Sequence, residues 1–236
     1  MVMNEKEIAE RITKKIDGFL AIDEGKFLFE CAKNCKGKGV IVEIGSWKGK
    51  STIWLGKGSK AGKKVKIYAI DPHTGSPEHK KKHSSVWTFD EFKQNIKNAK
   101  IDDIILPIVK TSEAAAKTFK KPVEFIFIDG AHEYEMVKLD YDLWFPKLID
   151  GGIIAFHDTV HWKGPKKLMR EIMSSRYFKN IGFVHSLCYA EKTKQNSLKD
   201  RLRNKIILLK KDIYEVCSNL YLPGSIRKIG KKVFWK

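Results

Sequence analysis

No stretch of this sequence is long and apolar enough to cross a membrane. The apolar runs are short, as at 152–156, whereas a span needs roughly 18 consecutive apolar residues. The first residues also lack the basic and then apolar pattern of an export signal. Cysteine is scarce, and the spacing of the four that are present fits neither a zinc site nor a disulfide framework. We therefore expect a cytoplasmic protein.

Acidic residues are few in relation to basic ones. The 236 residues include 28 Asp and Glu against 46 Lys and Arg, a formal net charge of +18. Half of this excess lies in residues 191–236, which hold 13 basic and 4 acidic side chains. A strongly basic chain suits nucleic acid, an anionic membrane surface or an acidic substrate. The net charge alone does not distinguish among these partners. A lysine-rich composition in a protein without any such partner gives the same excess of basic over acidic residues.

Predicted strands and helices alternate through most of the chain. Runs rich in β-branched residues, typical of strands buried on both faces, lie at 40–44, 65–71, 104–109, 123–129 and 152–158. Helical stretches lie among them at 51–59, 88–99, 111–119 and 134–148, and further helices are expected within 1–36. This alternation predicts an α/β fold with a Rossmann-like, doubly wound and mostly parallel sheet. A final strand is expected at 181–190.

Two parts of the chain differ in character. We expect one domain over residues 1–190, with its sheet core at 38–190, followed by a basic tail over 191–236. Within the domain, four of the five strands end in polar or acidic groups, which are Glu43 with Gly45, Asp71, Asp129, and His157 with Asp158. Ligands of such sheets bind at the carboxyl ends of the strands. The sequence therefore predicts a site at this edge.

The loop after the first strand contains spaced glycines. A phosphate-binding P-loop has four residues between its glycine and the Gly-Lys-Ser/Thr, but only three separate Gly45 from Gly49. Trp47 stands where a dinucleotide-binding loop has its second glycine. Glu43 would repel a polyphosphate and suits a cationic ligand instead. Asp71, at the end of the next strand, is placed to accept both ribose hydroxyls of an adenosine, or to cap its own turn.

Several segments, in this order, carry a resemblance to a known family: VEIGSWKGKSTIWL at 42–55, IYAIDPH at 67–73, FIFIDGAHEYEMVKLDYDLW at 125–144 and LIDGGIIAFHD at 148–158. The chain resembles the class I S-adenosyl-L-methionine-dependent methyltransferases over roughly residues 20–190. More narrowly, it is similar to the branch that contains O-methyltransferases of antibiotic sugars and metal-dependent O-methyltransferases of the catechol type. The resemblance implies cofactor-binding roles for Glu43, Gly45, Ser46, Gly49, Ser51, Asp71, Thr111, Ser112 and Asp129.

Transfer of a methyl group to a hydroxyl requires that the hydroxyl lose its proton. A divalent cation can lower the pKa of that hydroxyl, and hard cations prefer oxygen ligands. Asp129 and Asp158 end strands of the same sheet, and the resemblance implies that they hold Mg²⁺ and act in catalysis, with His132 as the general base. His157 is a further candidate ligand, although it stands where the catechol-type relatives have a carboxylate and is softer than Mg²⁺ prefers. Alternatively, Asp129 belongs to a turn, Asp158 caps a helix, and His132 is a solvated loop residue.

Two further segments suggest partners. Residues 73–87, with His79, the lysines at 80–82 and His83, are expected to form a mobile substrate loop that favours an anionic acceptor. Leu198, Leu202, Ile206, Leu209, Ile213, Val216 and Leu220 recur every four or three residues, which predicts an amphipathic helix. Its apolar face is expected to pack on the domain or on a second copy, which would make a homodimer.

The end of the tail, 225–236, places apolar and aromatic residues among five Lys and Arg. This composition suits an anionic membrane surface, which would make the protein peripheral at the membrane. RNA and a solvated tail are the alternatives. From the sequence we expect a methyltransferase that acts on a hydroxyl of a sugar or glycan-type small molecule, with or without Mg²⁺. The rivals are an RNA methyltransferase, a P-loop-type phosphotransferase and a non-catalytic binding module.

Overall fold

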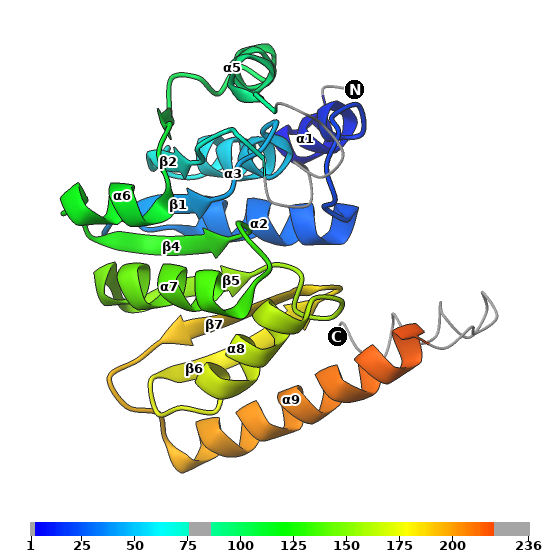
Figure 1. Cartoon of the computed structure of the whole chain (residues 1–236), viewed down its shortest axis with the longest axis vertical. Coiled ribbons are helices and arrows are strands. Elements are labelled where there is room, and N and C mark those ends of the chain that lie inside the picture. Colours follow the sequence, from blue (N-terminus) through cyan, green and yellow to red (C-terminus); the bar gives the residue numbers. More distant parts are fainter. Residues whose placement is uncertain (1–2, 76–85, 220–236) are drawn as a thin grey trace.

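A computed structural model describes residues 3–75 and 86–219 of the chain. Its strands form a single sheet in the order β3-β2-β1-β4-β5-β7-β6, and the predicted Rossmann-like α/β fold is confirmed (Figure 1). The bounds are β1 (Val40–Ile44), β2 (Ile67–Ile70), β3 (Ile105–Ile108), β4 (Val123–Ile128), β5 (Leu148–Phe156), β6 (Phe178–Val184) and β7 (Leu187–Lys192). The first five strands run parallel, whereas β7 is antiparallel to both β5 and β6. The carboxyl ends of β1, β2, β4 and β5 therefore meet at one edge.

Helices cover both faces of this sheet (Figure 1). One face carries α1 (Glu5–Thr13), α2 (Ile22–Asn34), α3 (Lys50–Ala61) and α5 (Phe89–Asn98). The other carries α6 (Ser112–Thr118), α7 (Tyr134–Trp144), α8 (Lys163–Met173) and α9 (Leu198–Asn219). None of the helices in the described residues is long and apolar enough to span a bilayer.

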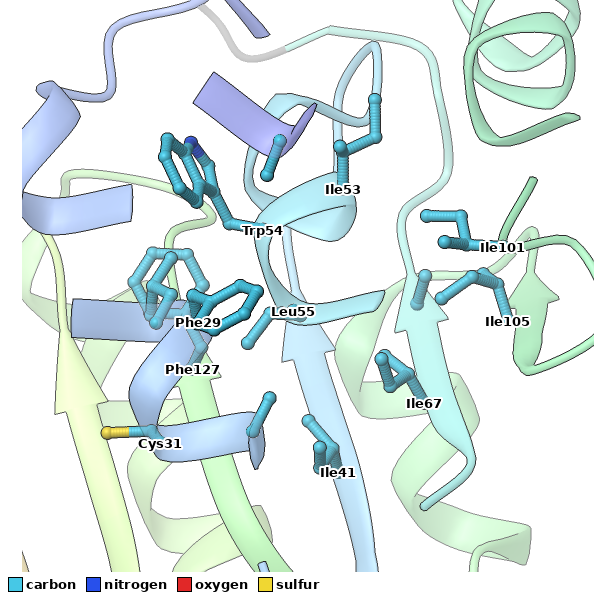
Figure 2. Close-up of a cluster of buried hydrophobic side chains, with 14 of the residues drawn as sticks. Phe29, Cys31, Ile41, Ile53, Trp54, Leu55, Ile67, Ile101, Ile105 and Phe127 are labelled. Carbon is cyan, nitrogen blue, oxygen red and sulfur yellow. The ribbon is translucent and has the colours of Figure 1, made fainter. Parts of the chain in front are cut away.

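Alternate residues of the central strands supply two separate hydrophobic cores. Ile41 of β1 and Phe127 of β4 point to one face, whereas Val42 points to the other. Figure 2 shows part of the first core, in which Phe29 of α2 and Leu55 of α3 pack beside Phe127. Full burial of one such side chain contributes about 1.5–3 kcal/mol. This double burial explains why the parallel strands read as continuous apolar runs.

The cysteines are structural in this fold. Cys31 and Cys35 lie one turn apart at the end of α2, and all four cysteines have free thiols. Burial raises the pKa of the Cys35 thiol to about 12, and it also raises the pKa of the Cys31 thiol. Neither thiol ionises near neutral pH, which agrees with the absence of a zinc or disulfide pattern in the sequence.

Several predicted bounds are wrong, each for a local reason. The helix expected at 134–148 ends at Trp144, because Pro146 lies in a short 3-10 helix, Phe145–Lys147, and β5 begins directly after it at Leu148. The single strand expected at 181–190 is a hairpin of β6 and β7. Its turn is formed by His185, with φ of 52°, and Ser186, and neither is a residue that marks a hairpin turn in a sequence.

The tail expected at 191–236 starts within β7 and continues into α9, which packs against β6 and α8 on the second face of the sheet. Its predicted amphipathic pattern is present, but the predicted apolar stripe does not pack on the domain: its members from Leu198 to Val216 are exposed. The expected loop around 76–85 and the residues 220–236 lie outside the described part of the chain. The boundary between domain and tail at residue 190 stays a prediction.

Candidate active site

The loop between β1 and α3 lies where the ends of β1 and β4 come close together. Gly45 has φ of +84°, and a Cβ added there would lie 2.1 Å from the carbonyl oxygen of Asp129. Gly49, with φ of +88°, begins α3, and its N–H donates to the carbonyl of Ser46 at 2.7 Å. Only glycine combines these backbone angles with so little space. The loop is therefore held against the end of β4 and leaves its backbone close to any ligand at this edge.

Asp71 fixes the shape of this loop. One oxygen of its carboxylate accepts hydrogen bonds from the backbone N–H groups of Ser46, at 2.9 Å, and Trp47, at 2.7 Å. The other accepts from the N–H of His73 at 2.6 Å, so Asp71 does cap its own turn. A carboxylate has about four acceptor positions, which leaves one of them for a hydroxyl of a ligand. The cap thus leaves room for one ribose hydroxyl, whereas the sequence predicted a contact with both.

Glu43 lies fully buried beneath the loop. One carboxylate oxygen accepts from the hydroxyl of Thr52 at 2.5 Å, whereas the other has no hydrogen-bond partner. Burial raises the pKa of Glu43 to about 8, against the opposing effect of hydrogen bonds from Ser51 and Thr52. The hydroxyl of Ser46 is also buried without a partner. Unpartnered buried oxygens are uncommon, and a pair of them beneath a glycine loop fits a ligand with a cationic amino group.

Thr111 and Ser112 stand at the start of α6, beyond the end of β3. The Thr111 hydroxyl caps the helix by accepting from the N–H of Ala114 at 3.2 Å. The Ser112 hydroxyl accepts from the indole N–H of Trp144 at 2.7 Å, and it also bonds the carboxylate of Asp140. Both hydroxyls therefore have structural partners, and their cofactor-binding role stays a prediction.

The predicted acid and histidine residues come together at the ends of β4 and β5. Nδ1 of His157 lies 3.0 Å from Oδ1 of Asp129 and 3.5 Å from Oδ2 of Asp158. The three side chains each offer an atom within 4.8 Å of the others. They meet because β4 and β5 are parallel neighbours, with Ile128 in register with Phe156. Asp158 adopts a φ of 57°, a conformation that aspartate tolerates better than most residues.

His132 joins this cluster from the loop after β4. Its Nε2 lies 3.0 Å from Oδ2 of Asp158, so that one carboxylate contacts both histidines. The indole of Trp162 stacks on the His132 ring with centroids 4.1 Å apart. Stacking and the carboxylate together fix the ring in one orientation. His132 is about 20% exposed, so it is neither a solvated loop residue nor sealed from a substrate.

Glu24 is a part of the site that the sequence did not reveal. It comes from α2, is 2% exposed, and its Oε2 lies 3.1 Å from Nε2 of His157. The same carboxylate accepts from the N–H groups of Ala21, at 2.8 Å, and Ser186, at 2.9 Å. In the sequence it is an ordinary acid in the first turn of a helix. Only the folded chain brings it to a histidine 133 residues away.

Charge in this cluster is closely balanced. Burial lowers the pKa of His157, but the carboxylates of Asp129, Asp158 and Glu24 outweigh it and hold the pKa well above its usual value. Burial raises the pKa of Asp158, and the two histidines outweigh it and keep that pKa low. Burial also raises the pKa of Asp129. The carboxylates thus require a positive charge among them, from a proton on His157 or from a metal ion.

The imidazole nitrogen of His157 and the carboxylate oxygens of Asp129 and Asp158 fit a divalent cation that accepts both nitrogen and oxygen ligands. Nδ1 of His157 faces Asp129 and Asp158, and its other nitrogen faces Glu24, as the outer nitrogen of a metal-bound histidine commonly faces a carboxylate. An imidazole beside two carboxylates suits a transition-metal ion better than Mg²⁺, which prefers oxygen alone. The expectation of Mg²⁺ at Asp129, Asp158 and His157 is therefore weakened by the histidine.

A groove opens beside His132. It has a volume of about 600 Å³ and is lined by His132, Glu133, Tyr134, His161, Trp162, Lys163, Gly164 and Lys167. Trp162 is 39% exposed, and the Lys167 ammonium lies 4.0 Å from the centre of the Tyr134 ring. The start of α8 forms one wall. The sequence analysis missed this groove because it did not predict α8, whose first residues include glycine, proline and lysines.

Comparisons with known proteins agree with this arrangement. A family model described as a methyltransferase domain matches residues 42–159, which is half of the chain. An uncharacterized protein of Acanthamoeba polyphaga mimivirus is 28% identical over 167 residues, which cover 64% of this chain and 68% of that protein.

Solved structures share the fold at low sequence identity. The O-methyltransferase NovP superposes with a TM-score of 0.65 at 16% identity, over 80% of this chain and 88% of NovP. The O-methyltransferase TomG from Streptomyces achromogenes, solved in complex with S-adenosylmethionine, gives 0.57 at 13% identity, over 82% and 91%. The match of the family model spans the glycine loop, Asp71 and the acid–histidine cluster, and the chain therefore belongs to the methyltransferase-domain family.

Proposed function

We propose that this enzyme methylates a hydroxyl oxygen of a sugar or glycan-type small molecule. The proposal rests on one observation above all: His132, held by Asp158, lines an open groove next to the ends of β4 and β5. A base at the rim of a groove suits an acceptor that must lose a proton as it is methylated. The O-methyltransferase names of NovP and TomG add support for an oxygen acceptor.

The glycine-loop half of the site would hold the cofactor. Glu43 and Ser46 would bind its methionine end, the backbone from Gly45 to Gly49 would lie against it, and the remaining acceptor position of Asp71 would take a ribose hydroxyl. Bound S-adenosylmethionine supplies a methyl group on a positively charged sulfur. The residues of this edge would hold the acceptor oxygen in line with that methyl group.

His132 would receive the proton of the acceptor hydroxyl. The carboxylate of Asp158, 3.0 Å from Nε2 of His132, would stabilise the positive charge that the ring gains when it accepts this proton. Asp129 would help to orient the acceptor beside it. Asp129, Asp158 and His157 would hold a divalent cation, which when bound lowers the pKa of an acceptor hydroxyl.

The groove favours a polar ring carrying negative charge. The exposed face of Trp162 is suited to stacking against the apolar face of a sugar ring. Lys163 and Lys167 at the same groove would attract a carboxylate or phosphate on the acceptor. The substrate loop expected at 73–87 stays a prediction, because residues 76–85 lie outside the described part of the chain.

Calorimetric titration tests the cofactor part of this proposal. S-adenosylhomocysteine and Mg-ATP are titrated into the wild type, into Asp71→Ala and into Asp142→Ala, the last an exposed acid on α7 that serves as control. We expect micromolar binding of S-adenosylhomocysteine by the wild type and the control, and a loss of at least about tenfold in Asp71→Ala. Binding of Mg-ATP in its place would show a phosphate-binding loop and would contradict the proposal.

An RNA acceptor is the second candidate, favoured by the net charge of +18. The two candidates respond differently to salt, because RNA binding releases many counterions whereas a small acceptor with one or two charges releases few. The affinity for a short single-stranded RNA is measured at two ionic strengths. Tight binding that falls steeply with salt and that S-adenosylhomocysteine leaves intact would favour RNA over a small molecule.

A further inference from the structure

Six large apolar side chains of α9 have no cover in the structure. They are Leu198, Leu202, Ile206, Leu209, Ile213 and Val216, and they are 46 to 80% exposed. Large apolar side chains occur singly on protein surfaces, but a row of six on one helix is unusual. The row starts at the first residue of the helix and reaches almost to its end.

Helix geometry places these six side chains in a single stripe. At 100° per residue they fall within a sector of about 80°, and they extend over about 27 Å of helix. The packed side of α9 is opposite and partly polar: Asn204 donates to the carbonyl of Phe178 at 3.0 Å, and Lys211 donates to that of Thr159 at 2.8 Å. The stripe therefore faces directly away from the protein.

The edges of the stripe are basic. Lys199 and Lys210 lie along one edge and Lys205 along the other, and all three are exposed. Asp212, the nearest acid, is paired with Arg170 at 2.6 Å. Long lysine side chains at the boundary of an apolar face can lie against it and extend their charge outward. Such a helix has the pattern of one that lies in the headgroup region of an anionic membrane.

A second copy of the chain fits this stripe poorly. Two such helices paired in parallel would bring Lys205 of one copy against Lys199 and Lys210 of the other. In the antiparallel arrangement each lysine edge would meet the same edge of the other copy. Like charges at both edges oppose pairing, whereas anionic lipid headgroups would neutralise them.

We propose that α9 is a membrane-docking helix that inserts this stripe among the headgroups of an anionic lipid surface. The chain continues beyond α9 with five Lys and Arg together with Phe234 and Trp235, a composition of the same kind. Docking brings the catalytic edge beside the bilayer, because Lys211 is bonded to Thr159, the residue after Asp158.

Vesicle flotation of the full-length protein tests this proposal. Vesicles of phosphatidylcholine alone are compared with vesicles that also contain phosphatidylglycerol. We expect the wild type to float with the anionic vesicles and to remain behind with the neutral ones. A variant that combines Leu202→Ser, Ile206→Ser and Leu209→Ser should lose binding by at least about tenfold. Because these side chains are exposed, the variant should keep the unfolding temperature of the wild type.

The control variant is Phe19→Ser, which removes an apolar side chain that is 89% exposed away from α9. It should bind the anionic vesicles like the wild type. Wild-type failure to float, or unchanged flotation of the triple variant, overturns the proposal. A dimer in solution that the triple variant abolishes also overturns it, because the stripe would then be covered by a second copy.

Discussion

The two halves of the catalytic edge hold their acids by different means. At the ends of β1 and β2, Glu43 and Asp71 are bound by a hydroxyl and by backbone N–H groups. At the ends of β4 and β5, Asp129 and Asp158 are bound by His157 and His132. The first set of donors does not titrate in the physiological range, whereas histidines do.

This difference suits the chemistry that we propose for each half. A cofactor pocket must keep one shape, which neutral backbone donors on a glycine loop provide at any ordinary pH. The other half must accept a proton, and for that purpose a histidine oriented by a carboxylate is suited. The comparison can be tested by changing one residue at a time in each half.

The largest effect is expected from His132→Ala. Removal of the general base should lower kcat by about 10²–10⁴-fold and leave the affinity for S-adenosylhomocysteine within about twofold of wild type. The measurement is the initial rate of S-adenosylhomocysteine release with the acceptor, beside calorimetry of the same samples. If His132→Ala lowers kcat and the affinity for S-adenosylhomocysteine equally, His132 belongs to the cofactor half, and the two halves do not differ as described.

Gly45→Ala should destabilise the glycine loop by about 3 kcal/mol or more. At Gly45 the added Cβ would meet a backbone oxygen, and φ is positive as well. Gly37 also has a positive φ, of +78°, but a Cβ added there would have its nearest neighbour 4.0 Å away. Gly37→Ala is therefore the matched control, with an expected loss of about 1 kcal/mol from the backbone conformation alone. Urea unfolding of both variants gives the two values. Similar losses would mean that the loop is less tightly held than the structure indicates.

Glu24→Gln should alter the pH dependence of stability in the histidine half. The folded pKa of His157 lies above its unfolded value, so its stabilising contribution is complete below about 6.5 and is lost as the pH rises through the folded pKa. Removal of one facing carboxylate lowers the folded pKa, so the loss should end at a lower pH and be smaller in total, with about 1–3 kcal/mol less stability at neutral pH. Thermal unfolding between about pH 5 and pH 9 measures this. An unchanged profile would show that His157 is neutral.

The smallest effect is expected for Glu43→Gln in the protein without ligand. The folded pKa of Glu43 is about 8, against an ordinary 4.5, so the wild type loses stability as the pH rises from 4.5 through 8. A glutamine has no charge to bury, and the variant should be more stable than wild type at about pH 9, by about 2 kcal/mol, and similar at about pH 4. A wild type that is more stable than the variant at about pH 9 would contradict this expectation and show that the ionised Glu43 carboxylate has a stabilising partner.

The sequence predicted the parts of this enzyme that depend on local pattern. The five parallel strands are continuous apolar runs because they are buried on both faces, and the meeting of Asp129, His157 and Asp158 follows from the order of those strands. Glu24 and the groove beside Trp162 depend on how distant helices pack, for which the sequence has no periodic signal. In α9 the periodicity was read correctly, but the packed face is the one that contains Asn204 and Lys211.

The bonds of Glu24 have a consequence for how the protein becomes active during synthesis. Glu24 is joined to His157 and to the N–H of Ser186, across 133 and 162 residues of chain. These contacts close late in folding, because a long loop must be ordered before they form. The Glu24 carboxylate therefore gains these partners only after nearly the whole sheet has left the ribosome. A nascent chain shorter than about 190 residues has the cofactor loop but lacks the finished surroundings of its histidines.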